Sequence, residues 1–185
     1  MYDTEDELAA LQALLDRSQA RMSAYMRTIL TANRRLSARQ LVTYLKGVKH
    51  VAVATVTAAG EPRVAPMEAL FVHGRFHLAT GAGAARVRHL RRRPGVSLTH
   101  FSGEDVAITV HGRPALLPHD HPDVPALEKV YVEVYGSSPF AWATDVLLVR
   151  VDPVTMYAHA SEPGRFPEGA TAPPARPRPV LVRRG

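Results

Sequence analysis

Short strand-like segments separated by tight turns follow one another from residue 51 to residue 111. This order restricts the possible folds more than any other feature of the chain. Segment 51–57 alternates Val and Thr with Ala and Val, which predicts a strand buried on both faces. Turns are predicted at 58–61 and 73–74, where Gly60 and Gly74 can adopt positive φ. Since one short helix interrupts these strands, the pattern predicts a mainly β fold with flanking helices.

The second predicted strand begins near Pro62 and contains a further proline. Pro66 cannot donate a hydrogen bond to a neighbouring strand, so it predicts a sheet edge or a bulge. Backbone amides and carbonyls left free at such a position can bind a flat polar heterocycle.

A third predicted strand, 75–79, leads through Thr80 and a glycine loop into an arginine-rich helix over 84–93. The free amides and the dipole of a helix N-terminus attract anions. Thr80 adds a hydroxyl, while Arg86 and Arg88 add permanent charge and forked donors that suit phosphate oxygens. The loop is neither a Walker loop nor a dinucleotide fingerprint. These residues predict a site for a phosphorylated ligand; for 91–93, a solvated face remains an equal alternative.

With these residues the chain resembles the pyridoxamine 5′-phosphate oxidase-like split β-barrels that bind flavins or deazaflavins, whose actinobacterial-type branch includes users of both. Four segments carry the resemblance, in the order VAVATVTAAGEPRVAPM, RFHLATG, ARVRHLRRRPGVSLT and VAITVHGRP. The resemblance spans roughly residues 36–160.

The resemblance implies a homodimer that binds FMN or coenzyme F420 in clefts between its subunits. It implies hydride transfer to a small or planar conjugated substrate. Cofactor-binding residues carried over from the family line the ring, namely Arg63, Val64, Ala65, Pro66 and Met67, or hold the phosphate, namely Thr80, Arg86 and Arg88. The proline-rich C-terminal part lacks the Arg-x-His element of true pyridoxamine phosphate oxidases, which argues against oxidation of vitamin B6.

Catalytic side chains cannot be read from the spacing, because no Ser-His-Asp set or carboxylate pair is recognisable. A flavin enzyme does not need one, since the cofactor carries the hydride chemistry. Two alternatives stay open: a haem-binding or haem-degrading split barrel, and a non-catalytic protein that binds a cofactor or nucleic acid. The arginine helix has no interleaved aromatic residues, which disfavours nucleic acid.

Three regions are expected: an N-terminal helical extension over 1–35, a split-barrel cofactor-binding domain over 36–161, and a flexible Pro/Arg-rich tail over 162–185. Ser37 and Gln40 predict a capped helix start. A helix is predicted over 125–135 with Gly136 as its end. Strands 146–151 and 155–158 are expected to form a final hairpin around Asp152 and Pro153.

Composition narrows the remaining possibilities. The chain has no cysteine and a net charge of +6, which favours anionic ligands. Without a membrane-length apolar run or a signal-like N-terminus, a cytoplasmic protein with no membrane partner is expected. His119, Asp120 and His121 lie between prolines without a third ligand, which predicts a polar turn and no metal site. Trp142 is expected to fill the core rather than to stack on a substrate.

Overall fold

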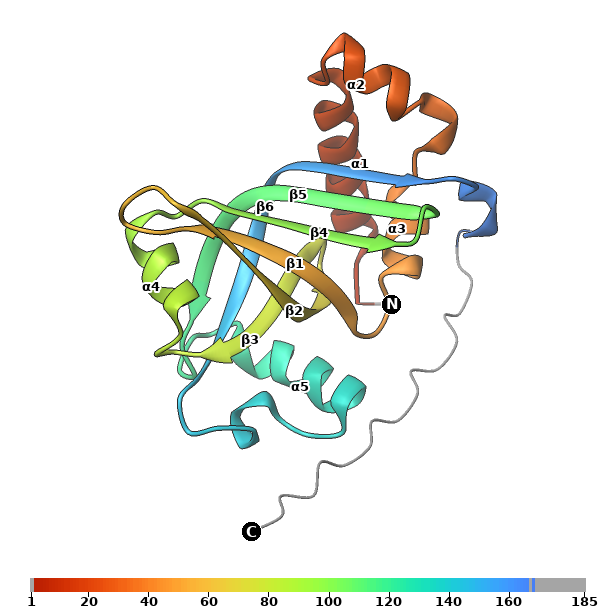
Figure 1. Ribbon diagram of the computed structural model, residues 1–185. Coiled ribbons are helices and arrows are strands. Elements are labelled where there is room, and N and C mark those ends of the chain that lie inside the picture. Colours follow the sequence, from red (N-terminus) through yellow and green to blue (C-terminus); the bar gives the residue numbers. More distant parts are fainter. Residues whose placement is uncertain (1, 167, 169–185) are drawn as a thin grey trace.

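The structure is a computed structural model that describes residues 2–166 and residue 168. Six antiparallel strands close a barrel in the order β1-β2-β3-β6-β5-β4, which confirms the mainly β split-barrel fold (Figure 1). The strands are β1 (Lys49–Val56), β2 (Pro62–Val72), β3 (Arg75–Gly81), β4 (Val96–Ser102), β5 (Val106–Leu117) and β6 (Val146–Ala160).

The predicted turns are confirmed. Gly60, with φ of 89°, lies in the turn between β1 and β2. His73 and Gly74 join β2 to β3 with φ of 52° and 71°, so two successive residues adopt the left-handed conformation that a tight hairpin requires. These local signals fix the register of the first three strands.

The expectation that β1 is buried on both faces is wrong for a single protomer. Val51, Val53 and Thr55 are buried inside the barrel, but the alternate residues Ala52 and Ala54 are only partly buried. No other element of the described chain covers this outer face completely. The small apolar residues of β1 therefore leave a partly exposed strip on the barrel surface.

The expected final hairpin is also wrong, because β6 continues as one strand through Asp152 and Pro153. The register between β5 and β6 shifts at His111 and Gly112, opposite this point. A bulge accommodates an irregular residue without ending a strand, and Pro153 lies where its missing N–H does not break a regular ladder.

Three helices precede the barrel: α1 (Glu5–Ala20), α2 (Ala24–Ile29) and α3 (Ala38–Tyr44), with the 3-10 turn η1 (Ala32–Arg34) before α3. The leucines of α1 join the same apolar core as the barrel strands. α1 also bonds β6 directly, because the Ser18 hydroxyl accepts from the Met156 amide at 3.0 Å. The predicted capping box of Ser37 and Gln40 is present at the start of α3.

The other helices are α4 (Ala85–Arg92), α5 (Val124–Tyr135), η2 (Pro139–Ala141) and η3 (Pro163–Arg165). Gly136 ends α5 in the left-handed conformation, with φ of 77°, as predicted. A second apolar cluster joins α5 to β2, β5 and β6 beneath the barrel (Figure 1). No helix in the described part of the chain combines the length and the apolar character needed to span a bilayer.

The first residues of the predicted tail contact the barrel. η3 follows β6, and the ring of Phe166 lies edge-on against Tyr44 at 5.0 Å between centroids. The Gln40 amide donates to the carbonyl of Pro163 at 3.0 Å. These contacts hold residues 163–166 on the barrel despite their proline. The rest of the predicted tail, residue 167 and 169–185, lies outside the described residues.

Candidate functional site

The barrel opens between β2 and β3. Only residues 69–72 of β2 pair with β3, whereas residues 62–68 pair with β1 alone in the described structure. The later part of β3 instead pairs with the beginning of β6. Pro66 lies in the half of β2 that has no partner strand on the β3 side. It therefore marks a sheet edge, which is one of the two alternatives predicted from the sequence.

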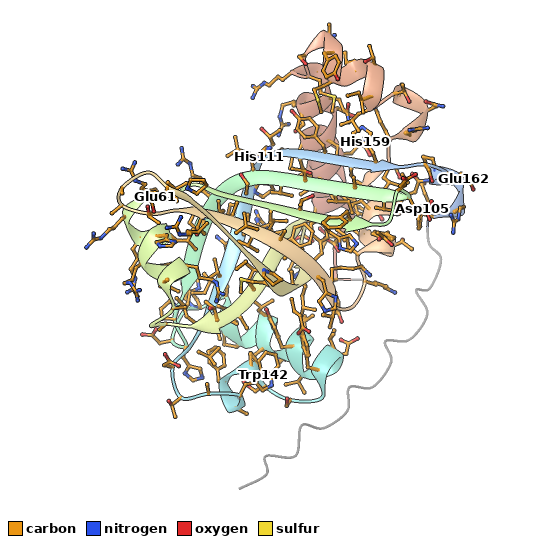
Figure 2. All side chains as sticks on the ribbon, viewed as in Figure 1. Glu61, Asp105, His111, Trp142, His159 and Glu162 are labelled. Carbon is orange, nitrogen blue, oxygen red and sulfur yellow. The ribbon has the colours of Figure 1, made fainter. Side chains whose placement is uncertain are left out.

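A cavity of about 250 Å³ occupies this opening. It is lined by residues from four elements and from the loop after η2, namely Pro66, Met67, Glu68, Ala79, Arg86, Tyr131, Tyr135 and Trp142. Figure 2 shows Trp142 beneath the barrel, beside α5. The cavity thus combines an open strand edge, a guanidinium, a carboxylate and three aromatic rings.

Arg86 is the cation of this cavity. The first turn of α4 places it beside the end of β3, and its Nη1 donates to the hydroxyl of buried Thr80 at 2.7 Å. Within the described residues no carboxylate forms an ion pair with Arg86. Its charge is therefore oriented by a neutral partner and left available for an anion.

Arg88, the second predicted phosphate contact, lies apart from the cavity. It is exposed, and its Nη1 donates to the carbonyl of Gly83 at 2.8 Å. Arg91 and Arg92 are also exposed, while Arg93 donates to the carbonyl of Ala58. The structure therefore brings Thr80 and Arg86 together and places Arg88, two residues further along the helix, on a different face of α4.

The loop before α4 offers fewer free amides than the sequence suggested. The amide of Ala82 donates to the carbonyl of Asp145 at 2.7 Å, and that of Gly83 reaches the Asp145 carboxylate at 3.4 Å. Asp145 follows Trp142 by three residues and lies 62 positions from Gly83. The Asp145 carboxylate thus occupies part of the site at which a ligand anion was predicted to bind.

The predicted ring-lining strand is divided between cavity and surface. Pro66 and Met67 line the cavity. Arg63 is exposed and pairs with Glu61 at 2.6 Å in the hairpin turn, and Val64 is 68% exposed. Ala65 is partly buried opposite Val53. Of the five residues predicted to line the ring, only Pro66 and Met67 therefore contact this cavity within one protomer.

Three aromatic residues form the wall opposite the strand edge. Tyr131 and Tyr135 stack at 5.7 Å, and Trp142 packs edge-on against both, at 6.0 and 5.0 Å. Trp142 is 40% exposed, so the expectation that it fills the core is wrong. Its N–H donates to the Ser137 hydroxyl at 2.9 Å, which fixes the ring at the cavity rim.

Tyr131 contributes a buried polar atom without a partner. The residue is 2% exposed, yet its hydroxyl forms no hydrogen bond in the described structure. Burial raises the pKa of Tyr131, and it raises the pKa of Tyr135 to about 12. Both phenols therefore stay protonated near neutral pH. An unsatisfied buried hydroxyl costs about 1–3 kcal/mol, which a polar ligand atom would recover.

Four lining residues were missed at the sequence level: Glu68, Ala79, Tyr131 and Tyr135. Tyr131 is one of the buried residues of α5, and it also borders the cavity. The spacing of four residues between Tyr131 and Tyr135 was the available signal, because it places both rings on one side of a helix.

The histidines lie away from the cavity. His100 bridges the Tyr44 hydroxyl and the His50 carbonyl, His111 bonds Ser97, and His159 bonds Gln19. The His119–His121 segment forms the predicted turn, with the amide of Asp123 bonded to His121. No group of three His, Asp or Glu side chains in the described ranges is arranged to hold a metal ion.

The sequence profile of the pyridoxamine 5′-phosphate oxidase family matches residues 37–160. This match covers more than half of the chain and includes every strand of the barrel and the helices α4 and α5. No curated protein matches the sequence at a significant level.

Solved structures with the same fold are distant in sequence. The conserved hypothetical protein Rv2991 from Mycobacterium tuberculosis is 17% identical, aligns over 77% of this chain and 96% of its own, and has a TM-score of 0.60. The haem storage protein HutZ from Vibrio cholerae is 18% identical, with 68% and 95% covered and a TM-score of 0.57. General stress protein 26 from Bacillus anthracis is 16% identical, with 65% and 91% covered and a TM-score of 0.52.

Proposed function

This chain belongs to the pyridoxamine 5′-phosphate oxidase family, and on that premise we propose that it is an oxidoreductase that uses FMN or coenzyme F420. The observation that carries the proposal is the cavity in the barrel opening, where an unpaired strand edge faces an oriented arginine and an aromatic wall. A phosphorylated planar ring needs these three features together: hydrogen-bonding backbone, phosphate charge and apolar surface.

Arg86 is the proposed phosphate ligand. Thr80 already orients its guanidinium at 2.7 Å, and no carboxylate in the described chain neutralises it. Thr80 can donate to a phosphate oxygen while it accepts from Arg86, so both residues can hold the same anion. Arg88 is exposed on a different face of α4, so we propose that it adds long-range positive charge and does not contact the ligand from the cavity wall.

Pro66 and Met67 are the proposed ring contacts. They lie on the half of β2 that has no partner strand on the cavity side, so neighbouring backbone groups remain available to ring nitrogens and oxygens. The unpartnered Tyr131 hydroxyl supports the fit, because a polar ring atom would satisfy it. When bound, the cofactor supplies the hydride chemistry, and these residues bind and orient it.

A small or planar conjugated substrate is proposed on the Trp142 side of the cavity. Trp142 is 40% exposed at the rim and its N–H is already bonded to Ser137, so the exposed part of its ring can contact a flat molecule. Tyr135 lies beside it and stays protonated, since burial raises its pKa to about 12. These residues exclude water from one side of the cavity.

A homodimer is proposed to complete the site. The cavity of about 250 Å³ in one protomer is smaller than the ~300–1,000 Å³ usual for ligand pockets. Val64 and the outer face of β1 also present apolar residues beside the cavity-lining strand. A second protomer covering this strip would enlarge and close the cleft.

The absorption spectrum of the purified protein tests the function. Flavin gives a band near ~450 nm and deazaflavin one near ~420 nm, whereas haem gives an intense Soret band. If the protein is purified colourless, titration with FMN and with F420 follows, read by the change in cofactor fluorescence. Failure to bind either cofactor would contradict the proposed function.

Haem is not favoured by the cavity. HutZ is described as a haem storage protein, but the likeness at 18% identity concerns the fold. Haem iron is most often held by histidine, and the cavity lining includes none. His77 and His100 are buried within the barrel, and His100 bonds the His50 carbonyl.

A further inference from the structure

The corner that follows α1, residues 21–34, contains a helix with no packing support. α2 has six residues, and none of them is buried. Isolated helices this short are unstable in water, because nucleation costs more conformational entropy than the first hydrogen bonds recover. Figure 1 shows α2 projecting from the end of α1, on the far side of the barrel from α5. The helix therefore lacks the tertiary contact that stabilises most helices.

Local contacts nevertheless fix the orientation of α2. The Ser23 hydroxyl accepts from the Met26 amide at 3.2 Å, and Arg27 donates to the carbonyl of Ala20 at 2.9 Å. Met22, which is 5% exposed, anchors the connection to α1. In the orientation set by these contacts the outer side chains of α2 lie away from the core.

The outer side chains are large and apolar. Tyr25 is 73% exposed, Ile29 is 47% exposed and Met26 is 37% exposed. Their spacing along one short helix places Tyr25 and Ile29 on the same face, with Met26 beside them. These three residues, together with Arg21 and Arg34 at the ends of the corner, are called the α2 tip.

The stretch of sequence that contains the α2 tip carries charge of a single sign. Residues 17–60 contain no aspartate or glutamate, and their basic residues are Arg17, Arg21, Arg27, Arg34, Arg35, Arg39, Lys46 and Lys49. Arg21 and Arg34 are exposed and form no ion pair within the described residues. An apolar helix face with an uncompensated arginine rim is complementary to a surface that is apolar inside and anionic outside.

We propose that the α2 tip docks the protein on an anionic lipid surface. Interfacial helices bind in this way, with aromatic and aliphatic residues in the headgroup region and arginines on the phosphates. A symmetric contact with a second copy would bring like charges together. Nucleic acid would engage the arginines but leave Met26 and Ile29 exposed. The docking is peripheral, so it needs no spanning segment, and it departs from the expectation of no membrane partner.

Sedimentation of the full chain with lipid vesicles tests this proposal. Vesicles of phosphatidylcholine mixed with phosphatidylglycerol should bind the protein, and vesicles of phosphatidylcholine alone should not. Each arginine near an anionic surface contributes about fivefold in affinity, so the double variant Arg21→Gln/Arg34→Gln should bind roughly 25-fold more weakly. Tyr25→Ser/Ile29→Ser should also reduce binding, and high salt should abolish it. Hydrogen exchange of α2 should slow on the mixed vesicles.

The double variant Arg91→Gln/Arg92→Gln is the matched control. It removes the same charge from exposed residues of α4 and should leave vesicle binding unchanged. If the control and the tip variant lose vesicle binding equally, net charge alone explains the effect and the proposal is overturned. Absence of binding to the mixed vesicles would also overturn it. Two further results would overturn it. One is binding of an oligonucleotide that depends on the tip while vesicles are not bound, and the other is a change in oligomer mass in the Tyr25→Ser/Ile29→Ser variant.

Discussion

Arg86 is the residue on which the proposed cofactor site depends most. Arg86→Ala should weaken FMN binding by roughly ten- to a hundredfold, because one charge-assisted phosphate contact contributes about 1.5–3 kcal/mol. Thr80 would keep its place in β3, so the protein should remain folded. Titration followed by flavin fluorescence measures the affinity. Arg92→Ala is the control, since Arg92 is exposed at the end of α4; equal weakening by both changes would refute the site.

His77 should make the protein less stable in acid. Burial, and to a lesser extent the charge of Arg150, lowers the pKa of His77 to about 3. Below about pH 6.5 the unfolded chain protonates this residue, whereas the folded chain keeps it neutral. The stability that neutral His77 contributes to the folded state is therefore complete above that pH and is lost as the pH falls toward 3. From pH 7 to pH 5 this costs about 2 kcal/mol of unfolding free energy.

Urea unfolding of His77→Leu at both pH values checks this effect. Whatever its stability at pH 7, the variant should lose about 2 kcal/mol less than the parent between pH 7 and pH 5. His159 should continue to contribute in both proteins, because burial and then Arg35 lower its pKa to about 4. An identical pH dependence in parent and variant would show that His77 takes up its proton equally in both states.

Individual residues were predictable where their chemistry is local. Arg86 next to Thr80 followed from a strand that leads through a short loop into a helix. Trp142 was placed wrongly, because its exposure depends on how the η2 loop lies over α5 and not on neighbours in sequence. Asp145 could not be foreseen at the α4 loop, since its partner Gly83 is 62 positions away.

Among the elements, the bulge between β5 and β6 depends on one glycine. A Cβ at Gly112 would lie 2.4 Å from the carbonyl oxygen of Asp152, and backbone cannot move aside cheaply. Gly112→Ala should therefore lower the unfolding free energy by about 1–3 kcal/mol. Gly95→Ala is the matched control, because nothing lies within 4 Å of its added Cβ. Thermal unfolding of both variants checks this, and equal melting temperatures would contradict it.

The segment after β6 should contribute to stability. A chain that ends at Glu162 loses the packing of Phe166 on Tyr44, the Gln40 bond to Pro163 and the ion pair of Arg165 with Asp105. Compared with a chain that ends at Glu168, it should be less stable by about 1–3 kcal/mol. Chemical denaturation of the two chains measures the difference. Equal midpoints would show that these contacts contribute nothing in solution.

Elements were predictable when their ends carried specific signals. The turns at Gly60 and Gly74, the capping box of α3 and the Gly136 end of α5 all rest on residues a few positions apart. β6 was divided wrongly, because Pro153 breaks a strand in isolation but fits a bulge that only β5 can provide. The opening between β2 and β3 likewise depends on which strands find partners.

At the scale of the whole molecule, the order of strands and helices identified the fold, but one protomer leaves two surfaces unexplained. The α2 tip is one of them. The other runs along the outer face of β1 and the adjoining part of β2, where Val64 is 68% exposed and Ala52 and Ala54 are partly exposed. Sequence alone could not separate a strand buried by its own chain from one buried by a partner, because both patterns are apolar on each side.

We expect this second surface to be the dimer interface, and we expect assembly and cofactor binding to be lost together. The cavity lies on the same strand as Val64, only two residues away at Pro66, so a partner that covers Val64 also reaches the cavity rim. Sedimentation at micromolar concentration should give twice the mass of one chain. Val64→Glu should shift the protein toward monomer, since it places a charge in an apolar contact, and should weaken FMN binding in parallel. A monomeric variant with unchanged FMN affinity would place the whole site within one protomer, and a monomeric parent protein would exclude the shared cleft.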